Sequence, residues 1–278
     1  MMSTLRPLSI FTFSLILTFV VQITSVQAGG GCRQHKATVV EFSSSMDTAQ
    51  ELRTTLNRTG DNVVLLARVG SDISQYGLTY THVGIARKRQ QSQEWEVVHQ
   101  LNPCSSDTSV LRVNGLANFM LDDLYTHDIQ VIRLGGELAQ ELGYVLKGDG
   151  PRKVYEPRYS MISYPGLPAK YQNSNQWVLE LITLAQARLE NQTLTNRQQT
   201  HKYYLRQGFK GSPIHLSALR RAFVRVGSKN VKFDDHPSGQ RFAGRFETVS
   251  VKSVISYLSS TGSLIGVYEI KTEYIRSE

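Results

Sequence analysis

The chain has 278 residues, with 31 Lys and Arg against 23 Asp and Glu, and two cysteines. About 250 residues are enough to bury a full core, in one domain with extensions or in two domains. The positive charge favours anionic surroundings such as cell-wall polymer or lipid headgroups. The basic residues are scattered and no zinc-finger or aromatic-basic signature is present, so we expect no nucleic-acid partner.

An apolar run from Leu8 to Val21 follows Arg6 and precedes the small residues that end at Ala28. The run is shorter than the roughly 20 residues of a membrane span. It predicts a signal peptide over residues 1–28, cleaved near Ala28, and a periplasmic or secreted protein without a transmembrane segment after cleavage. An uncleaved anchor is the alternative. We expect a tail and helix over residues 29–60, and one domain with a helical C-terminal extension over residues 61–278.

Both cysteines, Cys32 and Cys104, lie in the exported part of the chain, where a disulfide is allowed. A bond between them would close a long loop and contribute roughly 4 kcal/mol in the chain-entropy model. Two unpaired thiols are the alternative. Lipidation of Cys32 is disfavoured because the expected leucine three residues before it is absent.

The first half of the chain reads mainly as strands. Met46 to Arg58 has helical spacing and ends at a Gly-Asp-Asn turn, and Leu116 to Leu124 also has helical spacing. Short apolar or alternating runs predict strands at Asn62–Val69, Tyr80–Arg87, Trp95–Leu101, Val110–Val113 and Ile129–Leu134.

The second half reads mainly as helices. A loop or crossover is expected from Gly148 to Tyr159, and a strong helix from Trp177 to Leu189. Further helices are expected near Asn196–Leu205, His215–Val224 and Ser250–Leu258, with a terminal strand at Leu264–Tyr274. The pattern predicts an α+β fold with a mainly antiparallel sheet.

Two histidines lie on neighbouring predicted strands. Strand alternation puts His82, Gly84 and Ala86 on one face, where the small residues leave space for a substrate. If Gly84 pairs with His99, the two histidines are diagonal neighbours on that face. A slip by one residue moves His99 to the other face. His99 then either orients His82 or is a half-buried histidine bonded to backbone.

A polar helix start supplies the third element. Asn173 is a good cap, and Gln176 can complete a capping-box arrangement that places Ser174 in the first turn. The helix end favours negative charge there, yet a serine hydroxyl stays neutral and needs a base to attack. Ordinary helix-start chemistry explains the same residues without catalysis.

This combination resembles the permuted branch of the NlpC-type, papain-like superfamily, which includes the lecithin retinol acyltransferase relatives. Its histidine precedes its cysteine motif, which commonly reads Asn-Cys, two residues, an aromatic and Val. The resemblance implies a permuted papain-like fold with Ser174 at the nucleophile position, His82 as base and His99 as third residue. We expect substrate contacts from Tyr80, Gly84, Asn173 and Trp177.

The mature chain also resembles a family of secreted bacterial proteins of unknown function, domain of unknown function 2145. The resemblance rests on Tyr76-Gly77-Leu78, Leu121-Asp122-Asp123-Leu124, the segment Tyr171 to Trp177, and Phe233-Asp234-Asp235-His236-Pro237. It implies no activity.

The segment Asp234-Asp235-His236 is a second polar cluster, which we interpret as a turn before the Ser250–Leu258 helix. Metal binding is the alternative, weakened because adjacent residues of an extended segment point to opposite sides. No dinucleotide, phosphate-loop or metalloprotease motif is present, so we expect no cofactor.

Two classes of function remain. The first is an exported hydrolase or acyltransferase acting on an amide or ester of the cell envelope, with Ser174, His82 and His99 as its site. The second is an inactive protein that binds an envelope peptide, polymer or lipid in the same cleft. A structural envelope protein is a weaker third.

Overall fold

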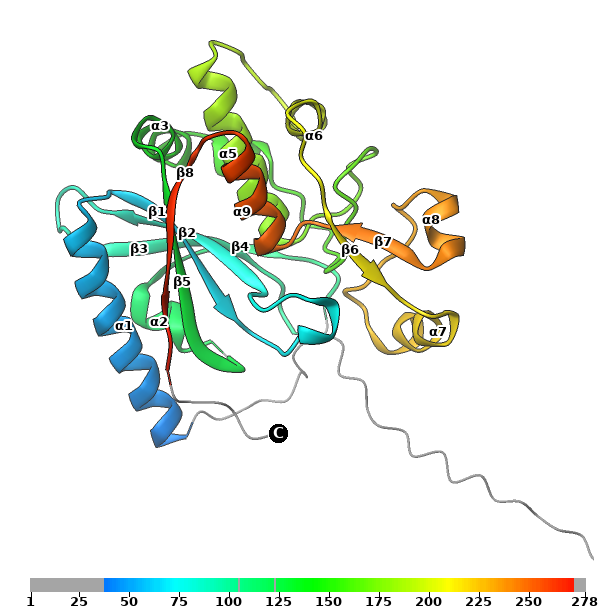
Figure 1. Ribbon diagram of the computed structural model, residues 1–278, viewed down its shortest axis with the longest axis horizontal. Helices are drawn as coiled ribbons and strands as arrows, with labels where there is room; N and C mark the ends of the chain where they lie inside the picture. The colour runs from blue at the N-terminus through cyan, green and yellow to red at the C-terminus, as the bar shows by residue number, and fades with distance from the viewer. Residues whose placement is uncertain (1–37, 105, 123, 273–278) are drawn as a thin grey trace, which may run out of the picture.

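The protein is an α+β structure built on one antiparallel sheet, as the computed structural model shows for residues 38–104, 106–122 and 124–272 (Figure 1). The sheet has six strands in the order β4-β3-β2-β1-β5-β8. Their bounds are β1 Val63–Val69, β2 His82–Lys88, β3 Trp95–Leu101, β4 Val110–Gly115, β5 Thr126–Leu134 and β8 Leu264–Ile270. The expected α+β class and antiparallel sheet are therefore confirmed.

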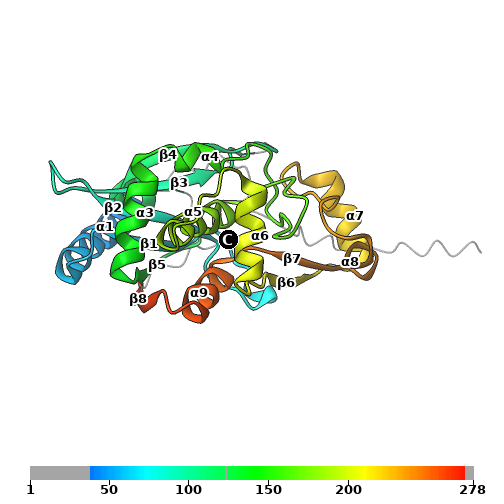
Figure 2. The ribbon, with the colours of Figure 1, turned by 90° about the horizontal axis from the view of Figure 1, so that it is seen from above.

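Helices cover both faces of this sheet (Figures 1 and 2). One face carries α1 (Val39–Thr59) and α2 (Leu116–Met120), and the other carries α3 (Gly136–Lys147), α5 (Ser174–Leu189) and α9 (Val251–Ser260). Strand β1 lies between the two layers, with Leu65 and Ala67 in one core and Val64 and Leu66 in the other. Burial on both faces explains its uninterrupted apolar sequence.

Helix α5 is the central helix of the molecule, and its residues from Ser174 to Ala187 are all buried. It begins at Asn173, whose side chain accepts a hydrogen bond from the Gln176 backbone N–H. The cap is as expected, but the reciprocal capping-box bond is not formed, because the Gln176 side chain bonds to Ser163 and the Tyr164 carbonyl instead. Burial all around makes α5 the scaffold of the polar residues at its start.

A smaller unit packs at one end of the sheet. It comprises the two-stranded ribbon β6 (Ser212–His215) and β7 (Arg245–Thr248), with α7 (Ala218–Gly227) and α8 (Ser238–Ala243). Its own apolar cluster includes Ile214, Val231 and Phe246 and reaches Ile162 of the preceding loop. The remaining short elements are η1 (Ser74–Tyr76), α4 (Gly150–Lys153) and α6 (Arg197–Arg206).

Several elements differ from the sequence prediction. Helix α1 begins at Val39 because Thr38 and Glu41 form a capping box upstream of the expected start. Helix α3, the ribbon and α8 were not predicted, and the segment Asp234 to His236 precedes α8 and not the Ser250-capped helix. Short ribbon strands carry little periodicity, which explains why they are missed.

The predicted signal peptide lies outside the described residues, so the prediction of export keeps its status as a prediction. Among the helices of the described ranges, none is long and apolar enough to cross a bilayer.

Candidate functional site

The site lies where strands β2 and β3 separate. Their pairing runs from Lys88↔Trp95 to Ile85↔Val98, while β1 stays paired with β2 as far as His82. The amide of Asn175 enters this opening from the first turn of α5. Its Oδ1 accepts from the Val83 backbone N–H at 3.0 Å, and its Nδ2 donates to the Thr81 carbonyl at 3.2 Å. The start of α5 is thereby fixed to the residues on both sides of His82.

The two predicted histidines meet. His82 Nε2 and His99 Nδ1 are 3.0 Å apart, and the ring of Phe119 packs against both. The contact between the two histidines requires Gly84 to align with His99. The strand register agrees with this alignment, since Ile85 pairs with Val98. Burial is the main cause that lowers the pKa of both histidines, well below the ordinary value for His82 and to about 4 for His99. Both rings are therefore neutral near pH 7.

A buried cation lies beside this pair. Arg68 of β1 is directly opposite His82 in the sheet, and its charge further lowers the pKa of both histidines. Its guanidinium donates to the Phe119 carbonyl and forms an ion pair with Asp122. The charge of Asp122 acts in the opposite direction on His99, but more weakly than burial and Arg68 do.

Ser174 occupies the first position of α5, as expected, and is buried. The Tyr159 phenol faces it: burial raises the pKa of Tyr159, and hydrogen bonding with the Ser174 hydroxyl and N–H opposes this rise. Among the described residues, no hydrogen bond joins Ser174 to His82. The structure therefore brings the two to one region without forming a nucleophile–base contact.

A cavity of about 490 Å³ opens onto this region. Its polar lining includes Tyr80, His82, Tyr159, Asn173, Ser174 and Asn175, and its charged lining residues are Arg68, Asp72, Asp122 and Arg220. Its apolar wall comes from Leu78, Ile162, Ile214, Leu216, Val224 and Val231, mostly residues of the smaller unit. A larger depression of about 720 Å³ runs along α1 to Thr272, and its lining includes no histidine among the described residues.

Two residues expected to contact substrate lie outside this cavity. Trp177 is wholly buried in the core and donates from its indole to the Pro151 carbonyl. Gly84 faces Val97, His99 and Phe119, and a Cβ there would lie 2.6 Å from Val97 Cγ1. The absence of a side chain at Gly84 therefore makes room for Val97, His99 and Phe119, and does not open a channel.

The segment Asp234 to His236 bonds to protein groups. Asp235 accepts from the Tyr164 backbone N–H and from His236 Nδ1, both within 2.9 Å. Asp234 points to a different group of residues and pairs with Lys170 and Tyr171. Within the described ranges, no three histidine, cysteine or acidic side chains are grouped to hold a metal ion. The segment fastens the smaller unit to the loop before α5.

Cys104 lies in the loop after β3 and lines the cavity. Cys32 is outside the described residues, so the Cys32–Cys104 disulfide stays a prediction.

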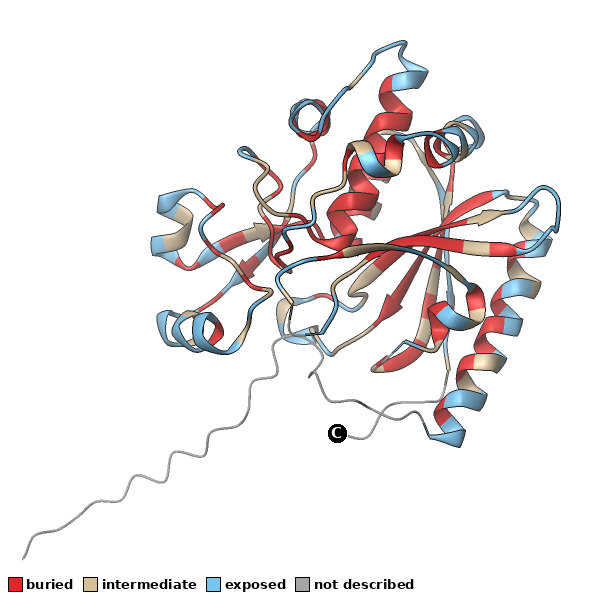
Figure 3. Cartoon of the chain, turned by 180° about the vertical axis from the view of Figure 1, so that it is seen from behind, coloured by how far each residue is buried: buried red, intermediate tan, exposed pale blue. Residues whose placement is uncertain are grey.

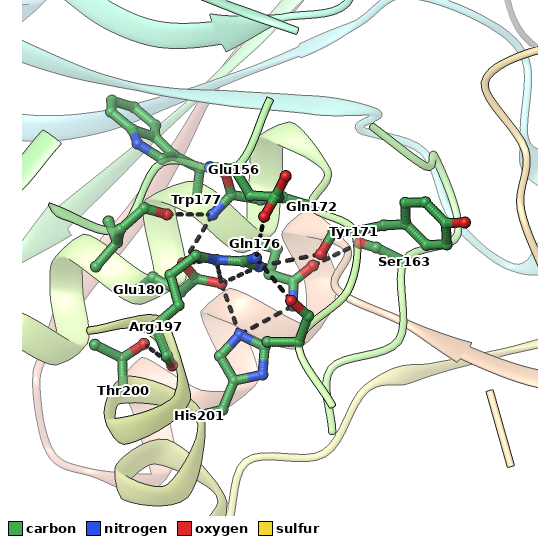
Figure 4. A network of polar contacts seen from close by, with 12 residues as sticks. Glu156, Ser163, Tyr171, Gln172, Gln176, Trp177, Glu180, Arg197, Thr200 and His201 are labelled. Atoms are coloured by element: carbon green, nitrogen blue, oxygen red, sulfur yellow. Dashed lines mark hydrogen bonds and ion pairs between the residues drawn. The ribbon is translucent and has the colours of Figure 1, made fainter. Parts of the chain in front are cut away.

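A buried polar network behind the site was not predicted (Figure 4). The carboxylate of Glu180, fully buried on α5, accepts from Arg197 at 2.9 Å and from Gln172 at 2.7 Å, and lies 2.7 Å from His201 Nε2. Burial raises the pKa of Glu180, but Arg197 and His201 outweigh it and hold the pKa below its usual value. The sequence signal for this network is an acidic residue on a largely apolar, buried helix, because a buried charge needs partners.

The sequence model of one family matches residues 55–258, most of the chain; it is described as an uncharacterized protein conserved in bacteria, DUF2145. No curated protein and no solved structure shows a significant match. The chain therefore belongs to the DUF2145 family of uncharacterised bacterial proteins.

Proposed function

We propose that this protein is an exported envelope protein of permuted papain-like fold that binds an acyl or peptide ligand in the 490 Å³ cavity without turning it over. The order of His82, His99 and Ser174 along the chain supports the papain-like frame, as does the position of Ser174 at a helix start beside an antiparallel sheet. The apolar run before Ala28 supports export.

The buried Arg68 carries the proposal that the site does not catalyse. A serine nucleophile needs a base that can hold its proton, and serine enzymes stabilise the resulting imidazolium with a carboxylate. Here the charge of Arg68 acts on both histidines, and its repulsion opposes formation of an imidazolium. Ser174, as a neutral hydroxyl, gains little from the helix end in compensation.

The hydrogen bonding of the histidine pair supports the same conclusion. The buried Nε2 of His99 has no partner among the described residues. A buried N–H without a partner is rarer than an unpaired acceptor, so we assign the shared proton to His99 Nδ1, which donates to His82 Nε2. Neutral His82 then carries its own proton on Nδ1 and has no lone pair there to receive another.

The cavity suits a ligand with an apolar body and one polar end. Its volume falls within the range of small-molecule pockets, which combine an apolar wall with a few polar groups. Aliphatic residues form much of its wall, and its polar lining residues include Ser174 and Arg220. The amides of Asn173 and Asn175 are bonded to protein groups.

Calorimetry of the purified mature protein with dodecanoic acid and with apolar tripeptides tests binding. We expect saturable binding of at least one probe, weakened at least about tenfold by Val224→Trp, which fills the cavity, and unchanged by Val113→Trp on the exposed face of β4. No heat from either probe, or equal effects of the two variants, would reject this ligand class.

A second function, hydrolase or acyltransferase, is favoured by the Asn175 clamp, which holds the start of α5 at His82. In that case Ser174 Oγ attacks the carbonyl carbon of an ester or amide. Its proton passes to His82 and then to the leaving alcohol or amine as the ester or amide bond breaks, while His99 orients His82. Water or an acceptor alcohol then releases the acyl group from Ser174. This requires the opposite tautomer, with Nδ1 of His82 unprotonated.

Active-site labelling separates the two functions. We expect no labelling of Ser174 by fluorophosphonates, because His82 cannot take the proton. Ser174→Cys should gain iodoacetamide reactivity that the Ser174→Cys/His82→Gln double variant retains, since a thiol at a helix start can ionise without a base. Labelling of native Ser174 that is abolished by His82→Gln would overturn the binding function and establish the enzyme.

A further inference from the structure

Helix α7 presents apolar side chains on two opposite sides. Val224 faces inward and, with Arg220, lines the cavity. Leu219, Phe223 and Val226 lie on the other side at helical spacing and are 69%, 63% and 92% exposed. A helix of a globular protein needs only its inward stripe, so the outer stripe lacks a role in the fold.

A further aromatic side chain lies at the same end of the molecule. Phe242 of α8 is 86% exposed, and both helices are largely pale blue where they project from the sheet (Figure 3). We call Leu219, Phe223, Val226 and Phe242 the α7 surface.

Positive charge predominates in the part of the chain that carries the α7 surface, although Arg220 lines the cavity and Arg221 donates to the Leu216 carbonyl. Helix α7 contains three arginines and no acidic residue, and residues 212–248 contain seven Lys and Arg against three Asp and Glu. Arg225 and Arg245 are exposed. Two of the three acidic residues, Asp234 and Asp235, already have partners in the protein.

We propose that the α7 surface docks onto the surface of an anionic lipid bilayer. Exposed apolar side chains flanked by arginines are the pattern of an interfacial helix, which inserts its apolar face between headgroups and holds anionic lipid with its cations. At 10 residues, α7 is about 15 Å long, so it lies in the plane of the surface and does not span it.

Charge also decides against a second copy of the chain as the occupant. A two-fold interface places the same patch on both partners, so it would bring together two regions of net positive charge. An anionic surface removes this repulsion. This proposal does not depend on the binding function.

Flotation of the purified mature protein with vesicles tests the docking. We expect binding to vesicles of phosphatidylglycerol and phosphatidylcholine, weaker binding to pure phosphatidylcholine, and a decline with added salt. Phe223→Ser should weaken partitioning about tenfold, and Arg225→Glu about fivefold or more. Val113→Ser, which changes an exposed valine on β4, is the matched control and should leave binding unchanged.

Three results would overturn the proposal. The first is no binding to anionic vesicles, and the second is equal loss in Phe223→Ser and Val113→Ser. The third is light scattering that shows a dimer abolished by Phe223→Ser with no vesicle binding, which would assign the surface to a second copy. All substituted residues are exposed, so thermal unfolding should be unchanged, and a loss of binding is then not a loss of fold.

Discussion

Helix α5 connects two buried polar clusters that use similar residues differently. In its middle, Glu180 pairs with Arg197 and lies against His201, and both nitrogens of His201 face oxygen atoms. At its start, His82 and His99 pair with each other beside Arg68, and His99 Nε2 has no partner among the described residues. A carboxylate beside a histidine thus helps to hold the fold together, whereas burial, reinforced by the charge of Arg68, keeps the histidines at the cavity neutral.

The largest expected effect comes from removing the negative charge of Glu180 in the middle of α5. Glu180→Ala leaves Arg197 buried without its carboxylate and should lower the free energy of unfolding by about 3–5 kcal/mol. Urea denaturation measures the change. Glu51→Ala on the exposed side of α1 is the control and should stay within about 0.5 kcal/mol. A similar loss in both variants would show that the network does not stabilise the fold.

The second cluster should show itself in the dependence of stability on pH. The folded pKa of His82 and of His99, the latter about 4, lies below the ordinary value of 6.5, so the unfolded chain binds more protons in between. The free energy of unfolding should therefore fall as the pH drops from 6.5 towards 4. His99→Gln should flatten this slope, while His215→Gln, at an exposed histidine, should not. An unchanged slope in His99→Gln would contradict the assignment.

The clamp between α5 and β2 should have an intermediate effect. Asn175→Ala removes the acceptor of the Val83 N–H and should cost about 2 kcal/mol, because a buried donor is left unpaired. Hydrogen exchange at the Val83 amide should speed up in parallel. Fast exchange of this amide in the unsubstituted protein would show that the opening between β2 and β3 is not held closed by Asn175.

The smallest effect concerns Ser174 and His82 directly. In a double-mutant cycle of Ser174→Ala and His82→Gln, the coupling in unfolding free energy should be below about 0.5 kcal/mol, because no hydrogen bond joins the two among the described residues. Coupling above about 1 kcal/mol would reveal the contact that an enzyme requires. Nitrogen chemical shifts of His82 would sharpen the result by reporting whether Nδ1 carries the proton.

Local sequence signals were sufficient for the central strands and for the start of α5. The apolar run of β1, the alternation in β2 and the Asn173 cap each act over a few residues, so their structures follow from short patterns. Helix α3 carried a usable signal in Leu138, Leu142 and Val145, spaced as on one helix face, and went unpredicted.

Longer-range features of the site lay beyond such patterns. Arg197 and His201 are 17 and 21 residues from Glu180 and reach it only because α6 packs on α5. The filling of the space at Gly84 by Phe119 likewise depends on α2, which is remote in sequence.

The sequence alone determined the α+β class, the neighbouring strands that carry the two histidines, and the serine at a helix start, because periodicity and capping are local. Tertiary structure decided the chemistry around them. The register of β1 on β2 placed Arg68 opposite His82, and the separation of β2 from β3 admitted Asn175. The charge that a histidine experiences depends on groups across the sheet, whose positions are fixed only when the strands pair.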